Sequence, residues 1–344
     1  MAVIKNLTIE GSGGDGADVT GSSAAAVAGI AAVVSSHTLI ENCVNRANIT
    51  APGSSFVGGL AGTCTGNNIT IKGCENYGKI LGTAGSSGGI VASITSTANE
   101  NIYITSCHNY GNLEIASIAS SSAGGVVGRS TNNTNAEIKW CSNRGNISLE
   151  ANSNNGTGGI IGSLFGYSVV QECFNLGEIK TFTNTGGIAG LLNPGSGTAN
   201  YTSINNCYNK GTIFYTTRTA VNNGGIAGNL TNYWAAPIEY CYNAGATNLP
   251  PTAVDRYSGI ASANSIAGGN LKEEFKGVKD CFYESDLGYI GGLGGSVVPA
   301  DVAEKAEGKT TEEMQPATPY TANWETSIWQ FTAGKYPMLK NNPE

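Results

Sequence analysis

Short runs of apolar, mostly β-branched residues recur along the chain, and Gly and Asn separate them. The clearest run has the form Ile/Val-x-x-Cys-x-Asn-x-Gly-x-Ile, in which Cys, Asn, Gly and the last Ile alternate with polar or variable positions. Such alternation predicts a strand with Cys, Asn, Gly and Ile on its inward face. The Ile three residues before Cys breaks the parity, so we expect a corner or bulge between that Ile and the Cys.

This run recurs at an interval of about 33 residues. The separations of its Cys residues are 31, 33, 34, 32, 34 and 34 positions: Cys43, Cys74, Cys107, Cys141, Cys173, Cys207 and Cys241. An Asn follows each Cys by two positions: Asn45, Asn76, Asn109, Asn143, Asn175, Asn209 and Asn243. Stacked repeats place equivalent residues above one another. We therefore predict Cys and Asn ladders, in which the Asn amides bond along the stack and to turn backbones. The Gly that follows supplies a positive φ or room for close approach of two walls.

A second run, Gly-Gly-Ile-Ala-Gly, alternates with the first. Its copies lie at 58–62, 88–92, 124–128, 158–162, 186–190 and 224–228, with weaker ones at 28–32 and 258–262. Several Gly in every repeat and the absence of an apolar stripe with period 3.6 argue against helical repeats. The sequence predicts an all-β fold, a parallel β-helix over residues 1–280, and right-handed crossovers are the general preference.

The end of the chain departs from the repeat. From Cys281 onward the sequence carries large apolar residues that the repeats lack, such as Trp324, Trp329 and Tyr336. A solenoid needs its ends covered, so residues 281–344 are predicted to form a C-terminal cap. Thr310 and Glu313 have the spacing of a capping box, which predicts a short helix there.

The Cys ladder has two interpretations. Equivalent residues on adjacent strands fall within the distance that a disulfide allows, but their side chains point the same way rather than towards each other. We favour reduced, buried thiols that serve as small apolar core residues. No Cys-x-x-Cys occurs, and His37 and His108 lie far apart, so the sequence indicates no metal site and no cofactor.

Composition restricts the classes of partner that the chain is expected to bind. The formal net charge is −7 and the basic residues are scattered, which disfavours nucleic acid. The longest apolar run, residues 24–34, is too short to span a bilayer, so no membrane insertion is expected. Residues 3–9 predict a strand instead of a secretory signal, which leaves a cytoplasmic protein or part of a longer exported one.

The repeats resemble the GLUG-motif repeats of bacterial surface proteins. The resemblance rests on the Gly-Gly-Ile-Ala-Gly and Cys-x-Asn-x-Gly-x-Ile runs and on an ending similar to that family's tail: residues 281–283, 309–314 and 336–339. Similar repeats occur in adhesins and beside secreted proteases that cleave immunoglobulin A. The resemblance implies a surface-exposed or secreted parent protein, and therefore an extracellular or cell-surface location. The strict regularity of the repeats leaves few special positions, so a structural or adhesive module is the leading hypothesis, with a host or environmental glycan or protein as its expected partner. No His-Glu-x-x-His motif is present to carry a protease function.

The residue directly after Cys offers one candidate binding surface. Phe174, Tyr208 and Tyr242 occupy this position in three consecutive repeats, where alternation predicts that they face outward. Stacked rings there could form a platform for sugar rings. The other interpretation is that aromatic residues simply pair favourably on neighbouring strands.

An enzyme is the alternative from a different class, because β-helices also host polysaccharide lyases and glycosidases that use paired carboxylates. The six Asp residues all lie outside the central repeats, and Asp255 and Asp280 are the nearest candidates for such a pair. Glu75, Glu114 and Glu178 occupy variable positions that are expected to face solvent. No catalytic residue is therefore predicted, and a non-catalytic module is favoured over an enzyme or an accessory region of a protease.

Overall fold

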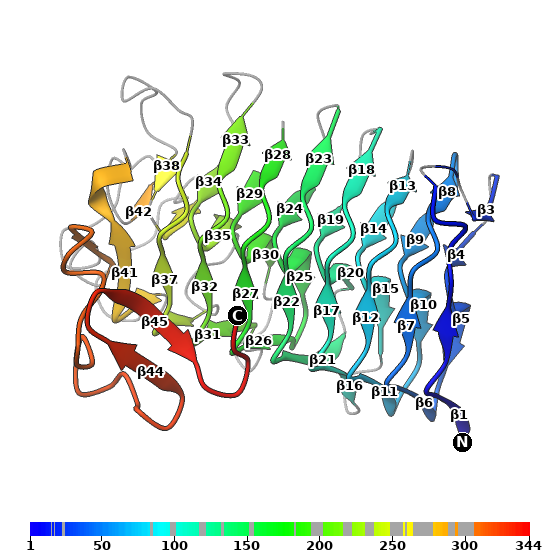
Figure 1. Cartoon of the computed structure of the whole chain (residues 1–344), viewed down its shortest axis with the longest axis horizontal. Coiled ribbons are helices and arrows are strands. Elements are labelled where there is room, and N and C mark those ends of the chain that lie inside the picture. The colour runs from blue at the N-terminus through cyan, green and yellow to red at the C-terminus, as the bar shows by residue number, and fades with distance from the viewer. Residues whose placement is uncertain are drawn as a thin grey trace.

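The chain folds into an elongated parallel β-solenoid, as the sequence predicts (Figure 1). The computed structural model describes residues 1–344 except 15, 17, 23–24, 83–84, 97–100, 117–121, 132–133, 151–154, 182–183, 194–201, 216–221, 231–236, 248–256, 259, 264–277, 288–292 and 295–305. In these described residues, five parallel sheets run along the rod, and most turns of the chain add one strand to each of them. The right-handed sense stays a prediction.

Two of the sheets carry the Ile-x-x-Cys-x-Asn run. Sheet A consists of β1 (Ala2–Lys5), β6 (Thr38–Glu41), β11 (Ile69–Lys72), β16 (Asn101–Thr105), β21 (Asn135–Lys139), β26 (Val169–Gln171), β31 (Ser203–Asn205), β36 (Ile238–Glu239) and β40 (Val278–Lys279). Sheet B consists of β2 (Thr8–Ile9), β7 (Val44–Asn45), β12 (Glu75–Asn76), β17 (His108–Asn109), β22 (Ser142–Asn143), β27 (Phe174–Asn175), β32 (Tyr208–Asn209), β37 (Tyr242–Asn243), β41 (Cys281–Glu284) and β43 (Ala306–Lys309).

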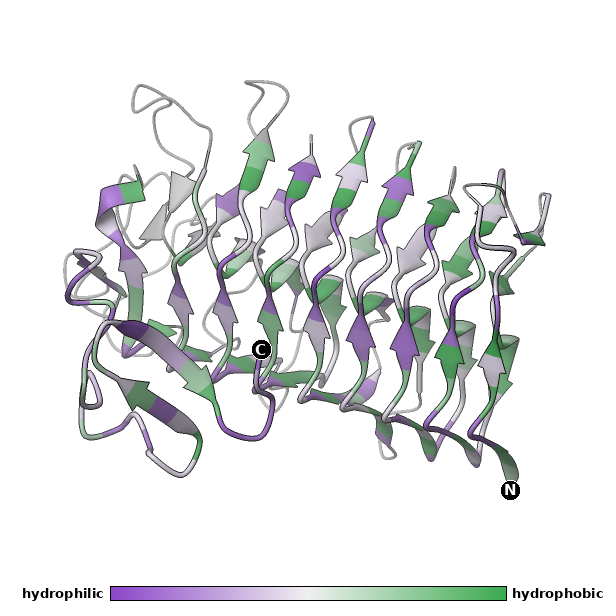
Figure 2. Ribbon diagram, in the orientation of Figure 1, coloured by the Kyte–Doolittle hydropathy of each residue, from purple (hydrophilic) through white to green (hydrophobic). Residues whose placement is uncertain are grey.

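Three further sheets complete each turn, and the strands in Figure 2 carry green hydrophobic segments beside pale or purple polar ones. Sheet C consists of β3 (Val19–Thr20), β8 (Ile49–Ala51), β13 (Ile80–Gly82), β18 (Leu113–Ile115), β23 (Ile147–Leu149), β28 (Ile179–Thr181) and β33 (Ile213–Tyr215). Sheet D consists of β4 (Val27–Ala28), β9 (Phe56–Gly58), β14 (Ser86–Gly88), β19 (Ala123–Gly124), β24 (Gly156–Gly158), β29 (Asn184–Gly186), β34 (Asn223–Gly224) and β38 (Tyr257–Ser258). Sheet E consists of β5 (Ala31–Ser35), β10 (Ala61–Thr65), β15 (Val91–Thr95), β20 (Val127–Ser130), β25 (Ile161–Phe165), β30 (Ala189–Asn193), β35 (Ala227–Leu230), β39 (Ala261–Ala263) and β42 (Leu293–Gly294).

A single residue in the left-handed conformation makes the corner between sheets A and B. It lies directly before each Cys, so it explains why the Ile and the Cys of one repeat both point inward. The φ angles of the corner residues from the second turn onward run from 47° to 62°: Asn42, Gly73, Ser106, Trp140, Glu172, Asn206, Tyr240 and Asp280. Only one of these corner residues is Gly, although residues other than Gly and Asn rarely adopt a positive φ angle. The corner is therefore imposed by the stack above and below it.

The Asn ladder runs unbroken through the interior. From Asn45 to Asn243, each Nδ2 donates to the Oδ1 of the Asn one turn further on, at 2.8 Å in every step. The same Nδ2 also donates to the backbone carbonyl two residues later, as Asn109 does to Gly111. All seven Asn side chains are fully buried, and these bonds satisfy their amides without water.

The second Gly of Gly-Gly-Ile-Ala-Gly packs against this ladder from the opposite wall. A Cβ atom at Gly125 would lie 2.3 Å from Cγ of Asn143 and 2.2 Å from the carbonyl oxygen of Gly159. The two sequence runs are therefore the two sides of one contact across the solenoid. The Gly after the Asn also serves close approach, because a Cβ atom at Gly111 would lie 2.0 Å from the carbonyl oxygen of Gly78.

The ladder separates two apolar cores. The larger core lies between sheets A and E and contains the Ile and Cys columns, with residues such as Ile71, Cys107 and Val91. The smaller core lies between sheets C and D, where Ile80 and Leu113 pack near Val57. Close packing of these β-branched residues holds the flat walls together.

All nine Cys residues are free thiols and buried. Burial raises the pKa of Cys64 to about 12 and that of Cys107 well above the ordinary value of a thiol. Cys64 stands in sheet E instead of the Cys column, in register with Val34 and Ile94. The column itself continues to Cys281, whose Sγ contacts the carbonyl oxygen of Ile238.

The predicted boundary at residue 281 and the predicted helix both differ from the structure. β41 and β43 extend sheet B, so the solenoid continues to Lys309. Thr310 and Glu313 form the reciprocal capping-box bonds, but the helix ends after a single turn, closed by the Met314 N–H and the Thr310 carbonyl. In the described residues the only helical element is the 3₁₀ helix Ser285–Leu287.

Replacing one Asn of the ladder is expected to destabilise the whole rod. In Asn143→Ala, the Nδ2 of Asn109, the Oδ1 of Asn175 and the carbonyl of Gly145 each lose a buried partner. Unmet buried groups cost roughly 1–3 kcal/mol each, so urea unfolding is expected to show a loss of roughly 2–4 kcal/mol. Lys180→Ala, on the exposed side of β28, is the matched control. A loss no larger than in that control would contradict the structural role of the ladder.

The thiols are expected to be unreactive in the folded chain. Because all nine thiols are buried, a thiol-specific reagent at pH 8 should label almost none of them until denaturant is added. Labelling after unfolding should then reach all nine. Loss of labelling sites in the unfolded, unreduced chain would instead indicate disulfides.

Candidate functional site

The aromatic residues predicted as a ligand platform do stack on the outer side of sheet B. The ring centroids of Phe174 and Tyr208 are 5.0 Å apart, and those of Tyr208 and Tyr242 are 4.9 Å apart. The interplanar angles are 8° and 1°, so the three rings form a nearly parallel column. All three are fully buried, however. The prediction that they offer an open platform is therefore wrong.

The C-terminal segment covers this column. Trp329 of β44 (Trp329–Thr332) has its ring centroid 6.1 Å from that of Tyr208 and 5.9 Å from that of Tyr242. Tyr336 of β45 (Lys335–Leu339) stacks on Tyr242 at 6.2 Å. The Tyr242 hydroxyl donates to the Pro337 carbonyl at 2.8 Å, and burial raises the pKa of Tyr242 well above its ordinary value. Outward orientation on the sheet thus serves the docking of the cap.

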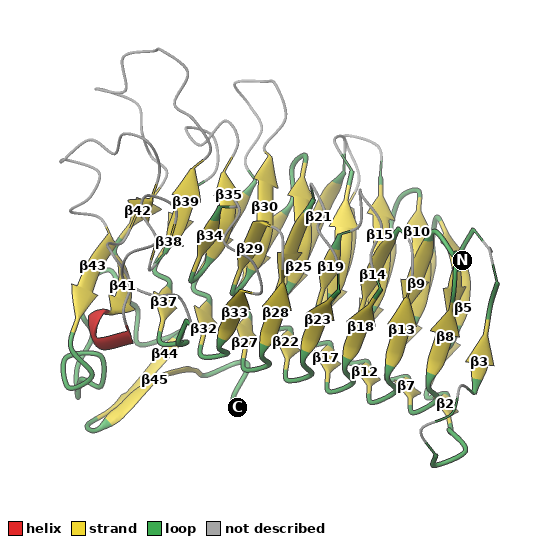
Figure 3. Ribbon diagram, turned by 90° about the horizontal axis from the view of Figure 1, so that it is seen from above, coloured by secondary structure: helices red, strands yellow, loops and turns green. Residues whose placement is uncertain are grey.

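The cap lies along the side of the rod and not across its end. The hairpin of β44 and β45 lies beside the last turns of sheet B in both views (Figures 1 and 3). The C-terminus lies next to β27 (Figure 1), and the Glu344 carboxylate accepts a hydrogen bond from the Tyr208 hydroxyl at 3.0 Å. The segment after Lys309, defined here as the cap, is therefore a lateral support for several turns.

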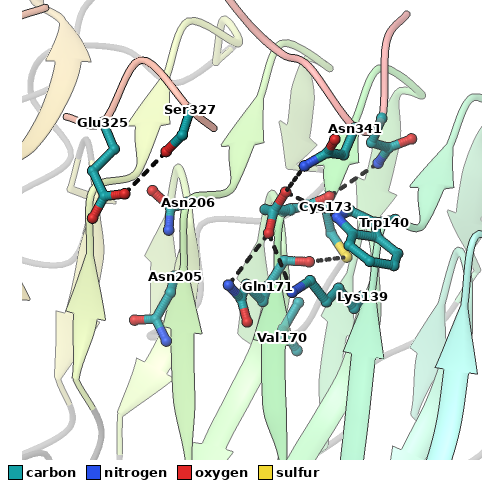
Figure 4. A network of polar contacts seen from close by, with 12 residues as sticks. Lys139, Trp140, Val170, Gln171, Cys173, Asn205, Asn206, Glu325, Ser327 and Asn341 are labelled. Atoms are coloured by element: carbon teal, nitrogen blue, oxygen red, sulfur yellow. Dashed lines mark hydrogen bonds and ion pairs between the residues drawn. The ribbon is translucent and has the colours of Figure 1, made fainter. Parts of the chain in front are cut away.

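A buried carboxylate fastens the tail of the cap. Glu172, a corner residue, is 3% exposed. Its Oε2 accepts from Trp140 Nε1 at 2.9 Å and from Asn341 Nδ2 at 3.2 Å, and its Oε1 lies 3.4 Å from Lys139 Nζ. Figure 4 shows Lys139, Trp140, Gln171 and Asn341 gathered at this point. These partners compensate the burial of the charge and tie the tail to two turns of sheet A.

A second aromatic pair lies at the surface of sheet B. The rings of Tyr77 and Tyr110 stack with centroids 4.6 Å apart and an interplanar angle of 3°. The guanidinium of Arg46 covers Tyr77 at 4.6 Å, and that of Arg144 covers Tyr110 at 5.2 Å. Sugar rings stack on aromatic faces, but here the guanidinium groups and the rings themselves occupy those faces. Only ring edges are open, so this pair is no sugar platform either.

An open pocket with a volume of about 430 Å³ lies on the outer side of sheet E. It is lined by hydroxyl groups, one aromatic ring and one cation: Thr95, Ser96, Ser122, Arg129, Ser130, Thr131, Asn155 and Phe165. Sequence reasoning missed it. The signal was available, because Arg129 stands in register with Ser93 and Ser163, which makes it a large charged residue between two small polar ones.

The structure describes only some of the carboxylates considered for an enzyme, and each of those named below has a polar partner of its own. Asp255 lies outside the described residues. Asp280 is a corner residue whose carboxylate accepts a hydrogen bond from Asn323 at 2.8 Å. Glu114 pairs with Lys79 at 2.8 Å. The carboxylate oxygens of Glu41 lie 2.7 Å from the Nζ atoms of Lys5 and Lys72. The hydrogen bond from Lys5, and after it the one from Lys72, holds the pKa of the Glu41 carboxyl below its ordinary value.

Metal and membrane features are equally sparse in the part of the chain that is described. It shows no group of three or more His, Cys, Asp or Glu residues placed to hold a metal ion. His108 contacts the Ser142 hydroxyl through Nδ1 at 2.8 Å. Among the same residues, no helix has the length and apolar character needed to cross a bilayer.

Comparisons with known proteins leave the family open. No protein-family model matches the chain, and no curated protein does. A solved structure with a similar course of the chain is described as a "putative immunoglobulin A1 protease from Bacteroides ovatus". It shares 15% identity, and the match covers 98% of this chain and 75% of that one with a TM-score of 0.40. A likeness at this level bears on neither family nor function, so the resemblance to GLUG-motif repeats stays a prediction.

Removing the central ring of the cap is expected to release it from the rod. Trp329 is fully buried, and Trp→Ala changes at such sites cost about 3–5 kcal/mol. In Trp329→Ala, proteases should cut within residues 310–344 at concentrations that leave the parent intact, while the solenoid persists. Gln330→Ala, at an exposed position of the same strand, is the control. Equal resistance of both variants would contradict docking through this ring.

Proposed function

We propose that this chain is a non-catalytic structural and adhesion module of a secreted or surface-exposed bacterial protein. The observation that carries the proposal is the pairing of its carboxylates with lysines within the solenoid. Glu41, Glu114 and Glu172 each pair with a Lys on the same or a neighbouring turn, so these carboxylates reinforce the stack. A polysaccharide-cleaving site requires two carboxylates that face each other across a substrate.

The shape supports the same role. Five sheets held by one continuous Asn ladder make an extended rod with a fixed spacing between turns. Such a rod suits the display of a binding surface at a distance from its anchor point, and solenoids present extended surfaces for this purpose. The lateral cap stiffens the last turns further, because its rings pack on three consecutive strands of sheet B.

An accessory region of a larger secreted protease is the second candidate. It is favoured by the two repeat runs, which resemble repeats found beside such enzymes. In that case the rod would position a separate catalytic domain, and the chain by itself would bind little. A host or environmental glycan or protein is the proposed partner of the adhesion module.

Binding and turnover by the same preparation distinguish these roles. The purified chain should be retained in a saturable way on a glycan array or on immobilised host matrix proteins. It should release no new reducing ends or unsaturated products from a panel of acidic and neutral polysaccharides. Polysaccharide cleavage would support the enzyme instead, and the absence of any retention would contradict adhesion and favour the accessory role.

A further inference from the structure

The pocket on sheet E contains a cation, Arg129, that forms no ion pair with a carboxylate among the described residues. Arg129 lies on β20, and its Nε is buried without a hydrogen-bond partner. Within the described residues its guanidinium contacts the Phe56 ring, at 5.1 Å from the centroid, and no carboxylate pairs with it. Burial lowers the pKa of Arg129, but a guanidinium stays protonated at neutral pH. A half-buried charge with only a ring for partner is costly unless an anion completes it.

The walls of the pocket are held in place by bonds within the solenoid. The Ser130 hydroxyl donates to the Phe165 carbonyl at 3.0 Å and accepts from the Phe165 N–H at 2.7 Å, so these two turns are locked together. Ser122 and Ser163 share a hydrogen bond of 2.9 Å. The Thr95 hydroxyl accepts a hydrogen bond from the Thr131 hydroxyl at 3.4 Å. A pre-formed site loses little ordering entropy on binding.

The composition of the lining restricts the ligand. The described lining contains one cation, Arg129, which can pair with one negative charge of a ligand. A polyanion would need several cations, and the net charge of −7 on the chain would repel it. The hydroxyl groups of the lining can form hydrogen bonds with hydroxyl groups of a ligand, and the Phe165 ring offers an apolar surface. A pocket of about 430 Å³ has the size of a small-molecule site.

We propose that this pocket binds the carboxylate of a sugar acid, with Arg129 as its anchor and the surrounding hydroxyls contacting the sugar. This inference rests on the proposed adhesion function and names the class of glycan that the module would recognise. The neighbouring turns do not repeat this site, because the positions equivalent to Arg129 there are Ser93 and Ser163. Binding is therefore expected at one ligand per chain.

Titration calorimetry with glucuronic acid, and with glucose as the neutral control, tests the proposal on the full chain. The parent should bind glucuronate at a stoichiometry near one and more weakly as salt rises, and it should prefer glucuronate to glucose. Arg129→Gln should weaken glucuronate binding by roughly tenfold or more, because a hydrogen-bonded charge is lost. Arg129→Lys keeps the positive charge but lacks the planar guanidinium, so its affinity for glucuronate should lie between those of the parent and of Arg129→Gln.

Arg46→Gln removes a guanidinium that also lies over an aromatic ring, but on sheet B, and should bind like the parent. All variants should show the circular dichroism and melting temperature of the parent, so that a folding defect is not mistaken for a lost site. Equal binding of glucuronate and glucose, parent-like binding by Arg129→Gln, or no binding by the parent would each overturn the proposal. Retention of Arg129→Gln on the glycan array at the parent's level would overturn it while leaving the adhesion function intact.

Discussion

The buried Asn ladder is the constraint on which the rest of the fold depends. An amide inside an apolar wall is tolerated only if its donors and acceptor are all paired. Here each Asn finds one partner in the turn above, one in the turn below and one in its own backbone, as Asn143 does with Asn109, Asn175 and Gly145. A slip of one residue in any turn would break these bonds and also turn the core residues to the surface. The ladder therefore sets the register of all five sheets.

Other features follow from keeping that register. The carbonyl and Cβ positions of the opposite wall must leave room for the amides, so Gly125 and its equivalents are required there. The chain must also turn between sheets A and B within one residue if both Ile and Cys are to point inward. Residues as different as Trp140 and Glu172 adopt the left-handed conformation to achieve this. The separations of 31 to 34 residues between successive Cys show that the spacing varies elsewhere while the register is kept.

The sequence reveals the features that repetition enforces and conceals those made once. The Asn and Cys columns, the strands and the parallel stacking could be read from the period and the alternation, because many copies carry the same signal. The corner conformation could not, since its residues share no chemistry. The position of the cap could not either, because Trp329 meets Tyr208 across 121 residues and no second copy of that contact exists. The predicted platform was wrong for this reason: Phe174, Tyr208 and Tyr242 face outward, but facing outward on a sheet does not mean reaching solvent.

In a solenoid of this regularity, functional chemistry has to reside where the pattern is broken. The run of aromatic residues on sheet B is one such break, and the cap occupies it completely, with the hydroxyls of Tyr208 and Tyr242 both bonded to cap residues. A second break in the pattern is Arg129, which stands in register between Ser93 and Ser163. No carboxylate neutralises its charge within the described residues. Where the side chains that break the pattern pack against other parts of the fold, the break is structural. Where a half-buried charge has no counter-charge among the described residues, the break costs free energy and stabilises nothing in return. That difference is the physical reason to look for a ligand at Arg129 instead of at the aromatic column.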